Sequence, residues 1–386
     1  MSTDNKSIKN KNIWVISPQE WGKMRVSKHH YAIAFANLGY QVIFVNPPKQ
    51  GKLGLKSNFR KIPTDIENLN ILQSDLSFPY GLKFKAYSLF KFFIKNHIRQ
   101  LIKVVPSPDL VLSFDMSGNY LLKNFPNAKK IYFPADEPRS KFALKAVESA
   151  DLLVSVTEEI LDKFPTFNNK LLLHHGLSGE FVNFKRSNKE SILCKSSNEF
   201  NIHCGLCGNF LRPDIDFDTI DNIVSENSNV FFHFFGAFKI QSNNLGGTLN
   251  NATIIKKIES LNNVHFYGII KPDELPSYLF QMDMFLVCYN IEKDQSGGTN
   301  YHKIMEYLST GKIIVSNNVT RFKNTDLFSY GKSRTNNDDL SMLFYSVTKE
   351  LYRYNVKELQ DRRRYFANSN SYSSLVHSIL ESVGGI

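Results

Sequence analysis

The segment from residue 297 to 318, GGTNYHKIMEYLSTGKIIVSNN, combines a glycine-rich start with a helical pattern that suits a phosphorylated ligand. Two glycines and Thr299 precede a predicted helix over residues 300–310, and an apolar strand follows that helix. The start of a helix presents unpaired backbone N–H groups and the positive end of the helix dipole. Gly298, Thr299 and Asn300 are therefore predicted to lie against a diphosphate.

Lys303 and Glu306 lie three residues apart in this predicted helix and share one of its faces. The lysine can neutralise phosphate charge, and the glutamate can accept hydrogen bonds from the two hydroxyls of a ribose. Acidic residues bind ribose hydroxyls in Rossmann sites for the same reason. An ion pair on the surface of an ordinary helix is the alternative, and these two residues alone do not decide between the interpretations.

Short apolar runs alternate with amphipathic stretches along the chain, in two series. Because the runs are continuous, they predict parallel strands that are covered on both faces. Predicted helices at 24–38 and 300–310 each end at a glycine, a common signal at helix C-termini. The pattern predicts an α/β protein with two Rossmann-like domains. The predicted strands are 13–17, 41–46, 110–114, 130–134, 152–157 and 171–175 in the first series, and 200–208, 229–236, 263–268, 284–289 and 312–316 in the second.

A polar run without periodicity, residues 183–199, separates the two series and is predicted to be the linker. We therefore place an N-terminal domain at 1–185 and a C-terminal domain at 186–364. The last segment, about 365–386, has a helical pattern, and we expect it to pack back on the first domain.

Three segments resemble family 4 glycosyltransferases. Residues 300–316, NYHKIMEYLSTGKIIVS, are similar to the donor-nucleotide motif of these enzymes, and residues 263–289 are similar to the segment that precedes it. Residues 149–181 resemble the last strands of their N-terminal domain. The likeness extends over about residues 12–330. It implies the GT-B fold, in which two Rossmann-like domains face each other across a cleft, and a retaining, metal-independent transfer from a nucleotide sugar.

The resemblance places the donor in the second domain. Many family members have two glutamates eight positions apart, and Glu306 fits the second of them, which implies that it binds the ribose. Gly298 occupies the first position, so the residue that would hold the sugar hydroxyls is absent there. The donor, a UDP- or GDP-sugar, is a substrate in this interpretation, and neither a cofactor nor a metal is expected.

Two basic residues in predicted loops of the second domain are candidates for contacts with the donor diphosphate. Arg212 follows the first strand of that domain, where enzymes of this type carry a basic residue, and Lys239 follows the second strand. A leaving diphosphate needs stabilisation by cations or dipoles when no metal is present. The alternative is that both are solvated loop charges, and this is the favoured interpretation for Lys239.

The candidates of the first domain, Gly22 for donor binding and the others for catalysis, lie after three of its predicted strands. Gly22 belongs to the loop after the first strand, which contacts acceptor and donor in the resembled fold, and His30 lies on the next helix. Asp136 and Glu137 follow a later strand, where α/β sheets bind ligands, and Asp115 has the same place on the strand before it. A carboxylate there can orient an acceptor hydroxyl or offset positive charge at the anomeric carbon. The alternatives are a packing role for His30 and an ion pair between a loop acid and a nearby arginine.

The positive charge of the chain is concentrated in its first part. The 386 residues include 47 Lys+Arg and 36 Asp+Glu, yet residues 1–150 hold 23 basic and 10 acidic residues. Such asymmetry favours an anionic partner. Residues 80–105 carry six basic and no acidic side chains among bulky apolar ones, which is typical of a helix at an anionic membrane surface. The alternative is an ordinary helix whose apolar side chains pack on the sheet. Nucleic-acid binding is not expected, because no RNP, KH or zinc-finger pattern occurs.

These observations predict a glycosyltransferase that moves a sugar from a nucleotide sugar to a saccharide or lipid-linked acceptor, in bacterial cell-surface polysaccharide synthesis. A sugar-nucleotide epimerase of the same fold and a non-catalytic partner subunit are the alternatives. No apolar run reaches the ~20 residues that a transmembrane helix requires, and the polar start, MSTDNKSIKNKN, is no secretory signal. A cytoplasmic location is expected, with residues 80–105 as a peripheral attachment to the cytosolic face of the membrane.

Overall fold

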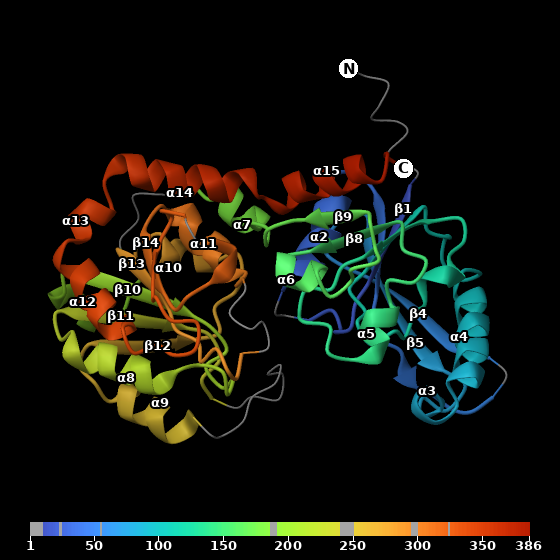
Figure 1. Cartoon of the computed structure of the whole chain (residues 1–386), viewed down its shortest axis with the longest axis horizontal. Helices are drawn as coiled ribbons and strands as arrows, with labels where there is room; N and C mark the ends of the chain where they lie inside the picture. The colour runs from blue at the N-terminus through green and yellow to red at the C-terminus, as the bar shows by residue number, and fades with distance from the viewer. Residues whose placement is uncertain are drawn as a thin grey trace, which may run out of the picture. The chain divides into compact units, whose positions relative to one another are not determined.

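The computed structural model describes residues 11–22, 25–54, 56–185, 191–239, 251–294, 300–322 and 325–386. The chain divides into two compact units, each built around a largely or wholly parallel β-sheet (Figure 1). The first unit comprises Met1–His174 and Tyr372–Ile386, and the second comprises His175–Ser371.

The sheet of the first unit has the strand order β3-β5-β2-β1-β6-β7-β8-β9, with β4 paired to β5. All neighbours pair in parallel except β4, which runs antiparallel to β5. The strands are β1 (Asn12–Ile16), β2 (Gln41–Val45), β3 (Lys49–Gln50), β4 (Asn58–Pro63), β5 (Leu69–Leu76), β6 (Leu110–Ser113), β7 (Lys129–Tyr132), β8 (Leu152–Ser155) and β9 (Lys170–Leu172).

The strands β4 and β5 were not predicted from the sequence. The β5 sequence, LNILQSDL, interrupts its apolar pattern with polar residues, although most of the strand is buried. Two of these polar side chains have buried partners: the Gln73 Oε1 accepts a hydrogen bond from Asn46 Nδ2 at 3.1 Å, and the Ser74 hydroxyl lies 2.9 Å from the Tyr120 hydroxyl. Such pairing allows a polar strand in the core, because buried polar groups with partners cost little.

Helices cover both faces of this sheet. Helix α2 (Ser27–Asn37) ends before Gly39, whose φ is +93°, and α15 (Tyr372–Ser382) packs next to it. Helix α4 (Tyr87–Leu101) packs its buried apolar residues into a different core cluster, on the opposite face. The short helices are α3 (Leu82–Lys85), α5 (Lys141–Lys145) and α6 (Glu158–Leu161).

The sheet of the second unit is wholly parallel, with the order β12-β11-β10-β13-β14-β15. Each of its first five strands matches a predicted apolar run. The strands are β10 (Ile202–Cys207), β11 (Val230–Phe235), β12 (Val264–Gly268), β13 (Met284–Val287), β14 (Ile313–Ser316) and β15 (Ser329–Tyr330).

Two core clusters lie on the faces of this second sheet. Helices α8 (Phe217–Glu226), α9 (Ala252–Glu259) and α12 (Leu340–Lys349) contribute to one cluster. The other contains side chains of α7 (Gly179–Val182), α10 (Leu275–Leu279), α11 (Lys303–Thr310) and α14 (Lys357–Ser369). Figure 1 shows α8 and α9 on one side of the strands and α11 on the other. A further short helix, α13 (Leu351–Tyr354), connects α12 to α14.

The division between the units differs at both places from the predicted domain boundaries. Leu177 and Phe181 belong to the core of the second unit, so that unit begins at His175 and not at residue 186. The return to the first unit begins at Tyr372 and not near residue 365, because α14 packs on α11. The buried Arg363 guanidinium of α14 donates hydrogen bonds to the carbonyl oxygens of Leu327, Gly311 and Tyr354, which holds this helix in the second unit.

Candidate functional site

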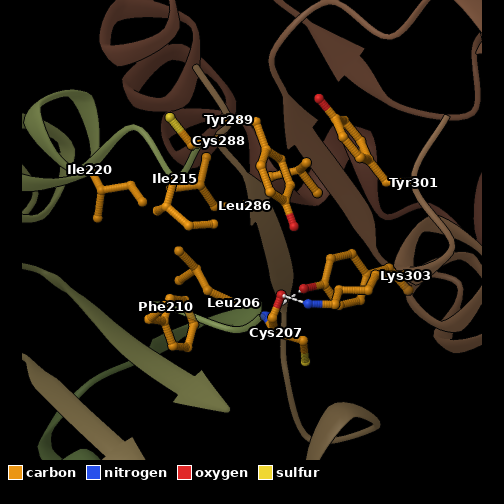
Figure 2. Close-up of a pocket in the computed structure, with 12 residues that line it drawn as sticks. Leu206, Cys207, Phe210, Ile215, Ile220, Leu286, Cys288, Tyr289, Tyr301 and Lys303 are labelled. Carbon is orange, nitrogen blue, oxygen red and sulfur yellow. Dashed lines mark hydrogen bonds between the residues drawn. The ribbon is translucent and has the colours of Figure 1, made fainter. Parts of the chain in front are cut away.

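Helix α11 is fixed against the carboxyl end of β10 through both polar groups of one residue, Cys207. The Cys207 backbone N–H donates a hydrogen bond to the Tyr307 hydroxyl at 2.6 Å, and its carbonyl oxygen accepts one from Lys303 Nζ (Figure 2). The Tyr307 ring stacks on Phe285 of β13 at a centroid distance of 4.1 Å. The first turn of α11 therefore has a defined position at the edge of the sheet where α/β proteins bind ligands.

The carboxyl ends of β10 and β11 approach so closely that only glycine fits between them. Gly236 has a φ of +139°, and a Cβ there would lie 1.7 Å from the Gly208 carbonyl oxygen. A Cβ on Gly208 would lie 3.3 Å from Lys303 Nζ. The lysine ammonium is thus held beside backbone with no side chain between them. Gly236 was not predicted from the sequence to be part of the site.

Glu306, also in the first turns of α11, has a carboxylate without a partner among the described residues. It is partly buried, and it makes no hydrogen bond or ion pair with any residue in the described part of the chain. Burial raises the pKa of Glu306 to about 7, an effect that Lys303 opposes and Glu180 reinforces. Burial also lowers the pKa of Lys303. A partly desolvated carboxylate in this state is well suited to accept hydrogen bonds from hydroxyl groups.

Of the other predicted donor contacts, Asn300 is buried just before α11, while Gly298 and Thr299 lie outside the described residues. Arg212 is held by Asp214: its Nε donates to Asp214 Oδ1 at 2.8 Å and its Nη2 contacts Oδ2. Hydrogen bonding to Asp214 raises the pKa of the guanidinium. The charges of Arg212 and Asp214 both affect the pKa of Lys303, so the structure brings Arg212, Lys303 and Glu306 into one electrostatic cluster.

Lys239 is placed differently from these residues. Its Nζ lies 3.4 Å from Glu259 of α9, and the side chain is 66% exposed. It also lies over the Phe238 ring, 4.6 Å from the centroid. These contacts agree with the interpretation of Lys239 as a solvated loop charge.

A narrow cavity of about 20 Å³ lies between β10, β13 and α11, and Figure 2 shows the side chains that line it. Tyr289 and Tyr301 stack there at 4.4 Å, and the Tyr289 hydroxyl points toward the end of the cavity formed by Cys207. The Tyr301 hydroxyl donates to buried Asp294 at 2.8 Å and accepts from Asn317 Nδ2 at 3.2 Å. This hydrogen-bond network was not predicted, because Asp294, Tyr301 and Asn317 have no regular spacing in the sequence.

In the first unit, Asp115 is a structural residue of the loop after β6. Its buried carboxylate accepts hydrogen bonds from the backbone N–H groups of Ser117 at 3.0 Å, Asn119 at 2.6 Å and Tyr120 at 3.1 Å. Burial raises the pKa of Asp115, while these hydrogen bonds and the charge of Lys83 oppose the rise. The geometry favours a role in shaping the loop over a role in proton transfer.

The two acids after β7 are in different environments. Glu137 pairs with Arg139 at 2.9 Å and with Lys163 at 3.8 Å, which is the ion-pair alternative considered for this loop. Asp136 is exposed, and its charge acts on Lys28 of α2. Burial lowers the pKa of Lys28 to about 8, and Asp136 opposes that shift.

The other two candidates of the first unit lie on either side of the start of α2. Gly22 is in the loop between β1 and α2, and a Cβ there would meet little, the nearest atom being the Glu20 carbonyl oxygen at 4.0 Å. The His30 ring stacks on Tyr372 of α15 at 4.9 Å and 17°. This contact supports the packing interpretation of His30.

Most of the apolar residues of 80–105 pack inside the first unit. Phe90, Ile94, Ile98 and Leu101 are buried in the core under α4, as the packing alternative requires. A second set faces outward: Phe84 and Phe92 are each 67% exposed. Within the described residues no helix is long enough and apolar enough to span a bilayer, and no group of three His, Cys, Asp or Glu side chains in those same ranges could hold a metal ion.

Neither a model of a protein family nor a curated protein matches the chain in sequence. Solved structures do match its fold. Sucrose-phosphate synthase from Thermosynechococcus elongatus is 8% identical, with a TM-score of 0.69 over 97% of this chain and 99% of that chain. HepE from Anabaena in complex with UDP is 11% identical, with a TM-score of 0.65 over 97% and 99%. An α,α-trehalose-phosphate synthase (UDP-forming) from Burkholderia xenovorans, in complex with glucose-6-phosphate, is 9% identical, with a TM-score of 0.64 over 97% and 100%. With its two parallel-sheet units and this similarity over nearly its whole length, the chain has the GT-B fold.

Proposed function

We propose that the chain is a glycosyltransferase that uses a nucleotide sugar, a UDP- or GDP-sugar, bound by the second unit. The observation that carries this proposal is the Glu306 carboxylate, which has no partner in the part of the chain that the structure describes and lies on a helix whose first turn is fixed at the carboxyl end of β10. Two hydroxyls of a ribose would supply the partners that this carboxylate lacks. The fold neighbours add support, since HepE binds UDP and the Burkholderia enzyme is UDP-forming.

Lys303 and Arg212 would stabilise the diphosphate of the donor. An ammonium has three N–H donors and a guanidinium has five. Lys303 uses one of them on the Cys207 carbonyl, and Arg212 uses two on Asp214. Both cations are therefore held in position while N–H groups remain for phosphate oxygens. Preorganised donors of this kind stabilise the negative charge that develops on a leaving diphosphate.

The first unit would bind the acceptor, with Asp136 as the carboxylate that orients its hydroxyl. Asp136 is exposed in the loop after β7, at the carboxyl end of a parallel strand, where open α/β sheets bind ligands. Our proposal includes a metal-independent reaction with retention of configuration and a role in cell-surface polysaccharide synthesis. The acceptor is a saccharide or a lipid-linked saccharide.

The protein would act in the cytoplasm, attached to the inner membrane surface through the outer face of α3 and α4. Phe84 and Phe92 are exposed on this face, and so are Lys85, Lys95 and Arg99. Residues 80–105 contain no acid. Apolar side chains between basic ones favour a membrane interface with anionic lipids.

Incubation with UDP-, GDP- and CDP-sugars tests the activity. A transferase hydrolyses its donor slowly without an acceptor and releases the nucleoside diphosphate. An epimerase would return an isomerised donor, and a non-catalytic subunit would give neither product. The base of the donor that is hydrolysed identifies the nucleotide.

A further inference from the structure

The first unit contains a cavity of about 410 Å³ that none of the predicted roles accounts for. It lies between α3 and the loops that follow β1, β6 and β7, at the carboxyl ends of parallel strands. Its volume is in the range of small-molecule sites, and its position is one where open α/β sheets bind ligands. The residues that line it include Tyr80, Lys83, Phe84, Arg139 and Phe142.

Lys83 is a buried cation in the wall of this cavity. Its Nζ donates hydrogen bonds to Asn119 Oδ1 at 2.8 Å and to the Tyr80 hydroxyl at 3.1 Å, and both acceptors are neutral. Within the described residues it has no carboxylate at ion-pair distance. Asp115 acts on it only through space, since backbone N–H groups occupy that carboxylate. A buried ammonium with neutral partners is incompletely compensated, which favours an anion next to it.

Aromatic rings surround this ammonium. It lies 4.9 Å from the Phe142 centroid and 5.2 Å from that of Tyr80. The Phe84 ring packs edge-on against Phe142 at 5.9 Å, yet Phe84 is 67% exposed. One ring therefore belongs both to the cavity wall and to the outer surface. Phe92 of α4, the helix that contacts α3, is also 67% exposed.

A second cation, Arg139, lies at the rim of the cavity. Its Nε donates to Glu137 at 2.9 Å, and the side chain is 65% exposed, so its other N–H groups are accessible. Lys83 and Arg139 together give the cavity two positive charges against the single negative charge of Glu137.

We infer that this cavity binds the phosphate end of a lipid-linked acceptor, that is, a phosphate ester of a long apolar chain. The phosphate contacts Lys83 and Arg139, and the apolar chain leaves over Phe84 toward the exposed face of α4. The inference rests on the proposed function, because it names the class of acceptor that the glycosyltransferase uses. A soluble sugar phosphate could bind to Lys83 and Arg139, but it has no apolar chain that would contact the exposed Phe84 ring.

Calorimetric titration of the full chain with three probes tests the inference. Farnesyl phosphate, below its micellar concentration, carries both features, whereas farnesol lacks the phosphate and inorganic phosphate lacks the chain. We expect farnesyl phosphate to bind at least tenfold more tightly than either of the other probes. Inorganic phosphate with equal affinity would overturn the inference in favour of a soluble anion, and farnesol with equal affinity would overturn the role of Lys83.

Variants assign this binding to the cavity. We expect Lys83→Gln and Arg139→Ala each to weaken farnesyl phosphate binding about tenfold, and Phe84→Ala about fivefold. Lys129→Gln is the matched control, because Lys129 is an exposed lysine of the same unit and does not line the cavity. If Lys83→Gln does not fold, the exposed Arg139 and Phe84 variants decide the outcome. Unchanged binding in both would refute the inference.

UDP binding, measured on the same samples, separates this inference from the proposed function. None of the four substituted residues is an expected contact of the nucleotide, so the four variants should bind UDP like the parent. A chain that binds UDP but not farnesyl phosphate would refute the acceptor class alone. A chain that binds no nucleotide would instead refute the proposed function.

Discussion

Lys303 and Glu306 share the first turns of α11, but within the described ranges only the lysine side chain has a hydrogen-bond partner. Its Nζ is bound to the Cys207 carbonyl, which lies 96 positions earlier in the chain, while the Glu306 carboxylate has no such partner among the residues described. The two residues are thus not the surface ion pair that their spacing allows. The lysine secures the helix, and in our proposal the glutamate binds the ribose of the donor.

Removal of the Glu306 carboxylate should weaken nucleotide binding. Loss of hydrogen bonds to a charged group costs ~1.5–3 kcal/mol, which corresponds to roughly ten- to a hundredfold in Kd. We expect Glu306→Gln to lose less than Glu306→Ala, because the amide oxygen still accepts a hydrogen bond. Titration of parent and Ala variant with UDP and 2′-deoxy-UDP gives a double-mutant cycle. Additive losses would show that Glu306 does not contact the ribose.

The stability of the chain should depend on pH through the same carboxyl. Its pKa is about 7 in the folded chain, compared with an ordinary value of 4.5. Between these values the folded chain holds a proton that the unfolded chain releases, so the free energy of unfolding falls as pH rises through this window. Glu306→Gln lacks this loss. Its Tm relative to the parent should therefore increase from pH 4.5 to pH 7 and stay level above that, and a constant difference would contradict the assignment.

Tyr307→Phe should destabilise the second unit. The substitution leaves the Cys207 N–H without the acceptor that now lies 2.6 Å away, and a buried donor without a partner costs ~1–3 kcal/mol. Thermal unfolding measures the loss. Tyr365→Phe is the control, because that ring is 77% exposed. Equal Tm values for the two variants would mean that the contact with Cys207 contributes nothing.

Asp136→Asn should lower turnover by about two orders of magnitude, in the range of general acid–base catalysis. UDP affinity should stay unchanged, since we place the nucleotide in the second unit. Glu137→Gln is the matched control: it changes the neighbouring acid, whose charge is already paired with Arg139. Equal effects of the two substitutions, or a loss of UDP binding with Asp136→Asn, would contradict the role of Asp136.

Reversal of charge on the outer face of α4 should release the protein from anionic vesicles. Lys95, Arg99 and Lys103 are exposed, and each basic residue near such a surface contributes ~1 kcal/mol. Their joint replacement by Glu should weaken co-sedimentation with phosphatidylglycerol vesicles at least a hundredfold, and salt should weaken that of the parent. The control replaces exposed Lys256, Lys349 and Lys357 of the second unit. If both triple variants sediment alike, net charge and not this face determines binding.

The fold could be predicted largely because its central strands are continuous apolar runs, such as IWVIS and KIIVS, separated by helices that end at Gly39 and Gly311. The strand β5 was missed because buried partners replace apolar side chains at Gln73 and Ser74. The predicted domain boundaries differ from the division in the structure for another reason. The polar run at 183–199 gives no sign that Phe181, just before it, packs into the core of the second unit.

The candidate site could be predicted only in part. The helix predicted at 300–310 and its two charged residues follow from the spacing of the residues. A contact between Arg212 and Asp214 can also be expected, because the two residues are only two positions apart. The contact between Lys303 and the end of β10 could not be predicted, because it joins residues that are distant in the sequence. The cavity of the first unit was missed because its walls come from four separate segments.

The position of α15 has a consequence for the synthesis of the protein. Tyr372, Leu375, Val376 and Ile379 are part of the core of the first unit, beside residues of α2. The ribosome makes α2 early and α15 only after the whole second unit. The part of this core that α15 covers therefore stays exposed until the second unit has been synthesised. Domains commonly fold one after another during translation, but here the unit that starts first is completed last.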